Sequence, residues 1–145
     1  MYLLCIAYQT DYRVSALKHK SGISLLAAKY LLKEGYSPCV CHPAYYSCLQ
    51  LMKYQIQKVI GKNYEQQDKE IASQNTNSHG YVIRAMKDYI AKTQGKKSAL
   101  QFDREIKDLK EVREKADYKV DVITHTMATD AIDNAEKLLR TINSI

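Results

Sequence analysis

The sequence predicts an all-α fold, a five-helix antiparallel up-and-down bundle, and three observations lead to that prediction. Of the 145 residues, 46% are hydrophobic, which suffices for the core of one domain of common size. The chain has only 5 glycines and 2 prolines, too few for the frequent turns of a sandwich or barrel. Apolar residues recur at spacings of three and four along most of the chain, which is typical of amphipathic helices.

The first two predicted helices lie before a polar segment. The first spans about residues 15–34, and Gly35 is expected to end it in a left-handed conformation. The second spans about residues 38–60, with Ser37 as its expected N-cap and a proline at its first position. Its side opposite the apolar stripe is also largely uncharged, which favours a central place in the bundle. Residues 62–77 are polar and are predicted to be a mobile loop with at most one helical turn.

Three further helices complete the predicted domain, which covers residues 15–145. They span about residues 78–93, residues 98–120 and the segment that follows Thr129, an expected N-cap. The apolar stripe of the fourth helix consists of Phe102, Ile106, Leu109, Val112 and Ala116. Residues 1–14 form an N-terminal segment to which the sequence pattern assigns no structure.

The chain has the features of an intracellular protein. It contains no run of 18 apolar residues, so we expect no membrane-spanning helix. Its start lacks the basic region and cleavage site of a signal peptide, so a cytoplasmic location is expected. Cys39, Cys41 and Cys48 lie close together and Cys5 is distant, a spacing that favours free thiols over a disulfide framework.

The formal net charge of +6 is distributed unevenly. Residues 1–60 carry 7 basic and 2 acidic side chains, whereas residues 101–145 carry 8 and 10. A basic half of this kind suits nucleic acid or an acidic partner. Solvated lysines on helix faces would give the same numbers, and the sequence leaves both interpretations open.

The clustered cysteines do not predict a metal site. Cys39 and Cys41 are two residues apart and point about 200° apart on a helix, so they cannot share one ion with His42 without unwinding the turn. Cys41 and Cys48 share a face, but it is the apolar one. The glycines are all isolated, so no phosphate-binding loop is present. We therefore expect no metal and no cofactor.

Two polar stretches stand out within otherwise regular helices. Tyr45 and Tyr46 are adjacent, so at least one hydroxyl must reach a polar partner or water. Arg113 and Asp117 are four residues apart and can pair on a helix, with Tyr118 on a nearby face. A buried hydrogen-bond network that fixes helix packing and a ligand-binding site both remain open for these residues.

In order along the chain, several motifs resemble the small stand-alone HEPN-domain proteins of bacteria and archaea. They are Leu31-Leu-Lys-Glu-Gly-Tyr36, Ala44-Tyr-Tyr46, Ser78-His79, Leu109 with Arg113-Glu-Lys-Ala-Asp-Tyr118, and Ala131 with Ala135-Glu and Leu139. The resemblance covers roughly residues 15–145. It implies a helical bundle that forms a homodimer, and a protein associated with RNA or nucleotides.

The resemblance also implies which residues form the site. Many HEPN proteins are metal-independent ribonucleases, some of them toxins, with an arginine followed four to six residues later by histidine. Here Arg113 matches the arginine, but Tyr118 lies five residues on, and a phenol is a poor general base at neutral pH. Arg113, Tyr118 and His79 are the catalytic candidates, and Arg113, Asp117, Tyr118, Tyr45 and Tyr46 are the binding candidates.

Three functions remain open on this basis. The first is a non-catalytic homodimer that binds RNA, a nucleotide or a protein partner through Arg113 and Tyr118. The second is a ribonuclease in which Tyr118, His79 or His42 replaces the missing base, which requires such a group near Arg113. The third is a structural partner of a nucleotidyltransferase. No membrane association is expected in any of them.

Overall fold

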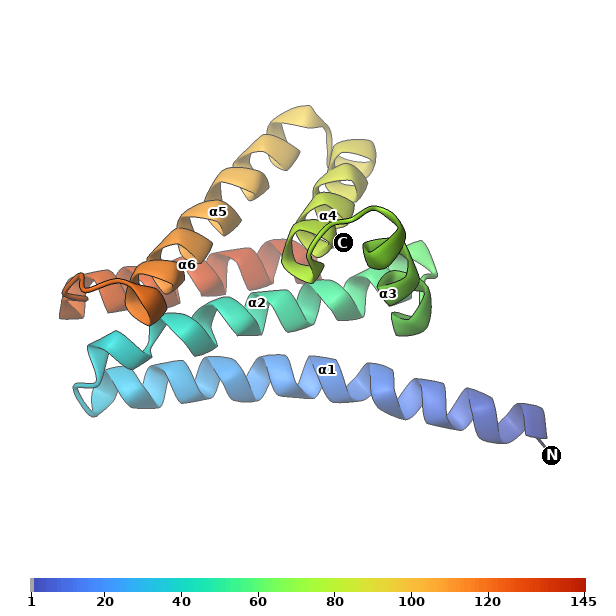
Figure 1. Ribbon diagram of the computed structural model, residues 1–145, viewed down its shortest axis with the longest axis horizontal. Coiled ribbons are helices and arrows are strands. Elements are labelled where there is room, and N and C mark those ends of the chain that lie inside the picture. The colour runs from blue at the N-terminus through green and yellow to red at the C-terminus, as the bar shows by residue number, and fades with distance from the viewer. Residues whose placement is uncertain (1) are drawn as a thin grey trace.

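The chain folds into a helical bundle, and the predicted all-α class is confirmed (Figure 1). The computed structural model describes the backbone of residues 2–145 and the side chains of residues 16–145. The elements are α1 (Tyr2–Lys33), η1 (Ser37–Cys39), α2 (Cys41–Gln55), η2 (Ile56–Ile60), α3 (Tyr64–Ser73), α4 (Ser78–Gln94), α5 (Lys96–Tyr118) and α6 (His125–Asn143). Within the described residues there are thus six α-helices where the sequence predicted five.

Helix α2 occupies the centre of the bundle, as its nearly uncharged surface predicted. It contacts α1, α4, α5 and α6. In Figure 1, α1 lies along one side of α2 and α6 along another, while α4 and α5 form a hairpin that rises steeply from it. Its fully buried side chains include Tyr45, Cys48 and Met52, which lie on the predicted apolar stripe.

The stripe predicted for the fourth helix is the inner face of α5. Phe102, Ile106 and Leu109 are almost fully buried there, and two further members, Val112 and Ala116, are partly buried. Arg113 follows Leu109 at the next helical turn and is buried as well. The buried face of α5 therefore includes a positive charge, that of Arg113, where α5 packs against α2.

The turn between α1 and η1 follows the predicted glycine stop. Gly35 has a φ of 81°, a left-handed conformation that glycine adopts without steric cost. The Gly35 N–H donates to the Leu32 carbonyl at 3.0 Å and the Tyr36 N–H to the Leu31 carbonyl at 2.8 Å. This is the Schellman pattern, which satisfies the last carbonyls of the helix.

The prediction of a mobile loop at residues 62–77 is wrong, because α3 occupies ten residues of it. Asn63 and Gln66 form a reciprocal capping box, with two hydrogen bonds of 2.9 Å. Gln67 is buried and its amide donates to the Lys62 carbonyl. A helix this polar has little apolar periodicity, so only the Asn-x-x-Gln spacing of the capping box could have indicated it.

Three predicted helix starts also differ from the structure. Helix α6 begins earlier than expected, since Thr124 caps it by accepting from the Met127 N–H, while Thr129 lies inside the helix. Ser37 caps nothing and belongs to the short turn η1. Helix α1 begins at Tyr2 rather than near residue 15, and the side chains of residues 1–15 lie outside the described part.

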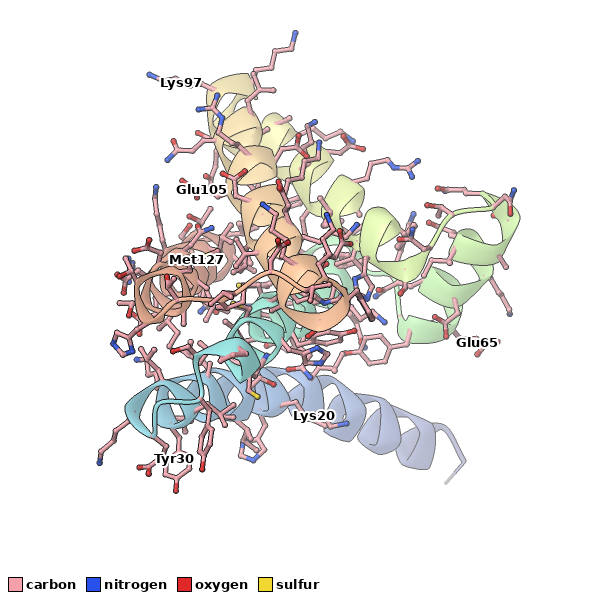
Figure 2. The ribbon with its side chains drawn as sticks, turned by 60° about the vertical axis from the view of Figure 1, so that its left-hand side comes forward. Lys20, Tyr30, Glu65, Lys97, Glu105 and Met127 are labelled. Atoms are coloured by element: carbon pink, nitrogen blue, oxygen red, sulfur yellow. The ribbon has the colours of Figure 1, made fainter. Side chains whose placement is uncertain are left out.

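Within residues 2–145, no helix combines the length and the apolar character needed to cross a membrane. Helix α1 nevertheless exposes the large apolar side chains Ile23, Leu26 and Tyr30, at spacings of three and four. These spacings place the three side chains on one face of α1. In Figure 2, Tyr30 extends from this helix away from the rest of the bundle.

Candidate functional site

Seven polar and aromatic side chains converge where α2, the first turn of α4 and the last turns of α5 meet. Helix α2 contributes positions i, i+3 and i+4 of one face, α4 contributes its second residue, and α5 contributes positions i, i+4 and i+5. The members are His42, Tyr45, Tyr46, His79, Arg113, Asp117 and Tyr118, and we refer to them as the Arg113 cluster.

Arg113 lies at the middle of the cluster and is only 6% exposed. Its guanidinium carbon is 5.4, 5.5 and 5.6 Å from the ring centroids of Tyr45, Tyr46 and Tyr118, distances at which cation–π attraction operates. Its Nη2 donates to the Tyr46 hydroxyl at 3.3 Å. Burial acts to lower the pKa of Arg113, but the Tyr46 hydrogen bond and the Asp117 charge outweigh it and raise this pKa.

Asp117 joins the arginine to His42. Its Oδ2 lies 3.3 Å from Arg113 Nε, but this N–H is not aligned to donate and has no hydrogen-bond partner. The same Oδ2 is 2.8 Å from Nδ1 of His42. The His42 ring stacks on Tyr46, with centroids 4.4 Å apart and planes at 18°. One carboxylate thus fixes the imidazole against an aromatic face.

His79 contacts both tyrosines from the α4 side. Its Nδ1 shares a hydrogen bond of 3.0 Å with the Tyr45 hydroxyl, and its ring meets Tyr46 edge-on at 5.7 Å. Burial lowers the pKa of His79 below its ordinary 6.5, and the positive charges of Arg113, Lys110 and Lys53 lower it further. His79 is therefore neutral at physiological pH. Burial also raises the pKa of Tyr45, so its hydroxyl keeps its proton.

The cluster is open to solvent on one side. Tyr118 is 76% exposed, although its ring contacts the Arg113 guanidinium. The His42 side chain is half exposed. Lys110 is bound to Glu114 at 3.6 Å, whereas Lys53 makes no ion pair with any described side chain. The surface therefore offers aromatic rings, imidazoles and positive charge together, which can bind a phosphate and the rings attached to it.

The structure brings together all six site residues selected from the sequence. The expected Arg113–Asp117 pair is present, and both hydroxyls of the Tyr45-Tyr46 pair have polar partners. His42 was not among these six, although it lies three residues before Tyr45 on the same helix face.

Neither a metal centre nor a known relative explains the cluster. Among the described side chains, no group of three or more His, Cys, Asp or Glu residues is placed to hold a metal ion. Cys39, Cys41 and Cys48 are free thiols, and burial raises the pKa of Cys41 to about 11. No protein family, curated protein or solved structure matches the chain. The chemistry of the cluster itself is therefore the basis for a functional proposal.

Proposed function

We propose that the chain is a HEPN-like homodimer that binds single-stranded RNA through the Arg113 cluster. The observation that carries the proposal is the convergence of a buried arginine, two histidines and an exposed tyrosine from three helices. Arginine in a fixed orientation binds phosphate oxygens with two N–H groups, and exposed aromatic rings stack on unpaired bases.

The charges around the cluster support an anionic ligand. Burial and then the positive charges of Arg113, Lys110 and Lys53 lower the pKa of His79, so three cations lie near this imidazole. The first 60 residues carry 7 basic and 2 acidic side chains, and α2 belongs to this basic part. A phosphate backbone gains affinity from such positive charge without any sequence preference.

The exposed ring of Tyr118 favours a single strand over a duplex. Tyr118 lies in the last turn of α5, beside the Arg113 guanidinium and open to solvent. In a duplex the base faces are stacked on one another, whereas unpaired bases are free to stack on an aromatic side chain. A phosphate near Arg113 and the adjacent base on Tyr118 would use both groups at once.

Binding of a labelled single-stranded RNA, followed by fluorescence anisotropy in a chelator, tests the proposal. Arg113→Ala should lower the affinity by about tenfold or more, because it removes a charge-assisted phosphate contact. Arg104→Ala is the matched control, since it removes an exposed arginine from the same helix. Equal affinities of Arg113→Ala and wild type would overturn the proposal. Should Arg113→Ala lose its helical circular dichroism, Tyr118→Ala gives the same test at an exposed position.

The proposed homodimer has a candidate interface on α1. Ile23, Leu26 and Tyr30 form an exposed apolar face there, and exposed patches of this kind mark association surfaces. Light scattering should give twice the chain mass of 16.7 kDa, and a value near one chain mass would exclude a dimer.

A metal-independent ribonuclease is the second candidate, and the two histidines favour it. His79 and His42 both contact Tyr46, and each binds a neighbour through Nδ1. Cleavage at a 2′-hydroxyl needs a neutral imidazole to accept a proton and a second group to donate one. His79 is neutral at pH 7, and Nε2 can accept a proton when Nδ1–H donates to Tyr45.

Incubation of RNA with the protein in a chelator separates the two candidates. A ribonuclease would lose cleavage by about 100-fold or more in His79→Ala, in line with general acid–base catalysis. His125→Ala, at the start of α6, is the matched histidine control. Intact RNA with wild type would exclude the enzyme and leave RNA binding as the function.

A further inference from the structure

A cleft of about 240 Å³ lies between η2, α3 and α4, and it shares no residue with the Arg113 cluster. Its apolar floor consists of Ile56 and Ile60 on η2 and Ala85 on α4. The rings of Tyr81 and Tyr89, also on α4, line it as well. In Figure 1, α3 lies beside the first turns of α4 at the far end of α2.

A change in helix type occurs at one edge of the cleft. Residues 56–60 form a π-helical turn at the end of α2, and Gly61 ends it with a φ of 75°. Such wide turns within α-helices occur frequently at functional sites. Two residues of this turn, Ile56 and Ile60, line the cleft opposite α4.

One wall of the cleft is fixed by a hydrogen-bonded carboxylate. Lys62 Nζ lies 2.7 Å from Glu70 Oε1 and 2.8 Å from its Oε2, and the Tyr81 hydroxyl donates a hydrogen bond to Oε2 at 2.6 Å. The Lys62 and Tyr81 hydrogen bonds lower the pKa of Glu70, so it stays ionised. Burial, followed by the Glu70 bond, raises the pKa of Tyr81 to about 12. The Glu70 carboxylate is thus already paired with Lys62 and Tyr81.

The other wall carries charges that are not used within the protein. Arg84, Asp88 and Lys92 lie four residues apart on α4 and all line the cleft. This is the spacing at which helix ion pairs form, yet no ion pair joins them among the described side chains. Arg84 makes only a long hydrogen bond of 3.4 Å, to Thr76. Glu70 is already paired with Lys62, so the charged groups available to a ligand are the cations of Arg84 and Lys92 and the carboxylate of Asp88.

We propose that this cleft binds a small organic anion, a planar ring that carries one phosphate or carboxylate group. The ring would lie on Ile60 and Ala85 beside Tyr89, and the anionic group would bind the Arg84 guanidinium. Asp88 accepts a hydrogen bond from an N–H or O–H of the ring system. A nucleoside monophosphate and an aromatic carboxylate both have this chemistry. The volume is below that of most drug-sized sites, which suits a ligand of this size.

Isothermal titration calorimetry with three probes tests the proposal and distinguishes a nucleoside monophosphate from an aromatic carboxylate as the ligand. The probes are adenosine monophosphate, indole-3-acetate and inorganic phosphate. We expect one of the two ring-bearing anions to bind at least about tenfold more tightly than inorganic phosphate, since only they use the apolar floor. If neither ring-bearing anion binds, or if phosphate alone binds as tightly, the proposal is overturned.

Two variants confine the binding to this cleft. Ala85→Leu fills the floor without changing any charge, and Arg84→Ala removes the proposed anion contact. Each should weaken the ring-bearing anion by about tenfold, whereas Arg104→Ala on α5 should not change its affinity. Tyr118→Ala should also leave it unchanged, because this exposed residue lies outside the cleft. Unchanged binding in both Ala85→Leu and Arg84→Ala would contradict the proposal.

Discussion

The two halves of α5 carry charge in different ways. In the first half, Asp103 binds Lys87 at 3.1 Å and Lys107 at 2.8 Å; the Asp103 side chain is 15% exposed, but its lysine partners are 34% and 63% exposed. Glu105 similarly binds Lys137 of α6 at 2.5 Å. Figure 2 shows Glu105 among many charged side chains along this helix. The second half also has the surface pairs Lys110–Glu114 and Lys115–Glu111, but in addition it holds the buried Arg113, whose guanidinium contacts three tyrosine rings.

The difference indicates which charge serves the fold and which serves a ligand. Exposed ion pairs contribute about 0–1 kcal/mol each, and the sequence can exchange them with little consequence. A buried guanidinium loses its hydration, and Arg113 Nε has no hydrogen-bond partner to replace that water. An apolar residue would pack there with less penalty, so a binding role is a physical reason for an arginine at this position.

Arg113→Ala should have the largest effect of any charge change on α5. It removes the cation that faces Asp117 and leaves space among three rings. We expect the free energy of unfolding to fall by about 3 kcal/mol, together with the loss of RNA affinity. Urea denaturation measures the first quantity. A fall in stability without any loss of affinity would show that Arg113 only packs the helices.

Asp117→Asn should separate stability from binding, because the two should change in opposite directions. The amide keeps the shape but loses the charge that faces Arg113 and His42, so unfolding should require about 1–2 kcal/mol less. RNA affinity should rise about twofold, because the substitution removes a negative charge that would repel the RNA phosphates. Denaturation and anisotropy on the same preparation measure both. Reduced affinity would mean that Asp117 orients groups that contact the RNA.

His79 should make the bundle less stable in mild acid. Its pKa is lowered from 6.5 by burial and by neighbouring cations, so the unfolded chain takes up this proton before the folded one. The stability that the neutral His79 contributes to the folded state is fully present above pH 6.5 and is lost as the pH falls through the lowered pKa. His79→Gln should therefore lose less thermal stability than wild type between about pH 7.5 and about pH 5.5. Identical losses would contradict the burial of a neutral imidazole.

Asp103→Asn should have the smallest effect. The Lys107 and Lys87 hydrogen bonds hold the pKa of Asp103 below its ordinary value although burial acts to raise it. Both lysines remain solvated when the charge is removed, so we expect a loss of at most about 1 kcal/mol. RNA affinity should not change. A loss as large as that of Arg113→Ala would remove the distinction between the two halves of α5.

The sequence predicted the parts of the site that lie within one helix. Arg113 and Asp117 are four residues apart, so their pairing follows from helix geometry alone. The contact of His79 with Tyr46 depends on how α4 packs on α2, and that of His42 with Asp117 on how α5 packs on α2, which periodicity does not determine. Helix α3 was missed for a related reason, because its capping residues rather than an apolar stripe define it.

The four histidines offer the most direct test of the claim that RNA binds at the Arg113 cluster. His42 and His79 belong to the cluster, whereas His19 on α1 and His125 on α6 do not. The imidazole NMR signals of the protein can be followed while single-stranded RNA is added. We predict that the His42 and His79 signals shift while those of His19 and His125 stay in place. Shifts of His19 or His125 without shifts of the other two would contradict the claim.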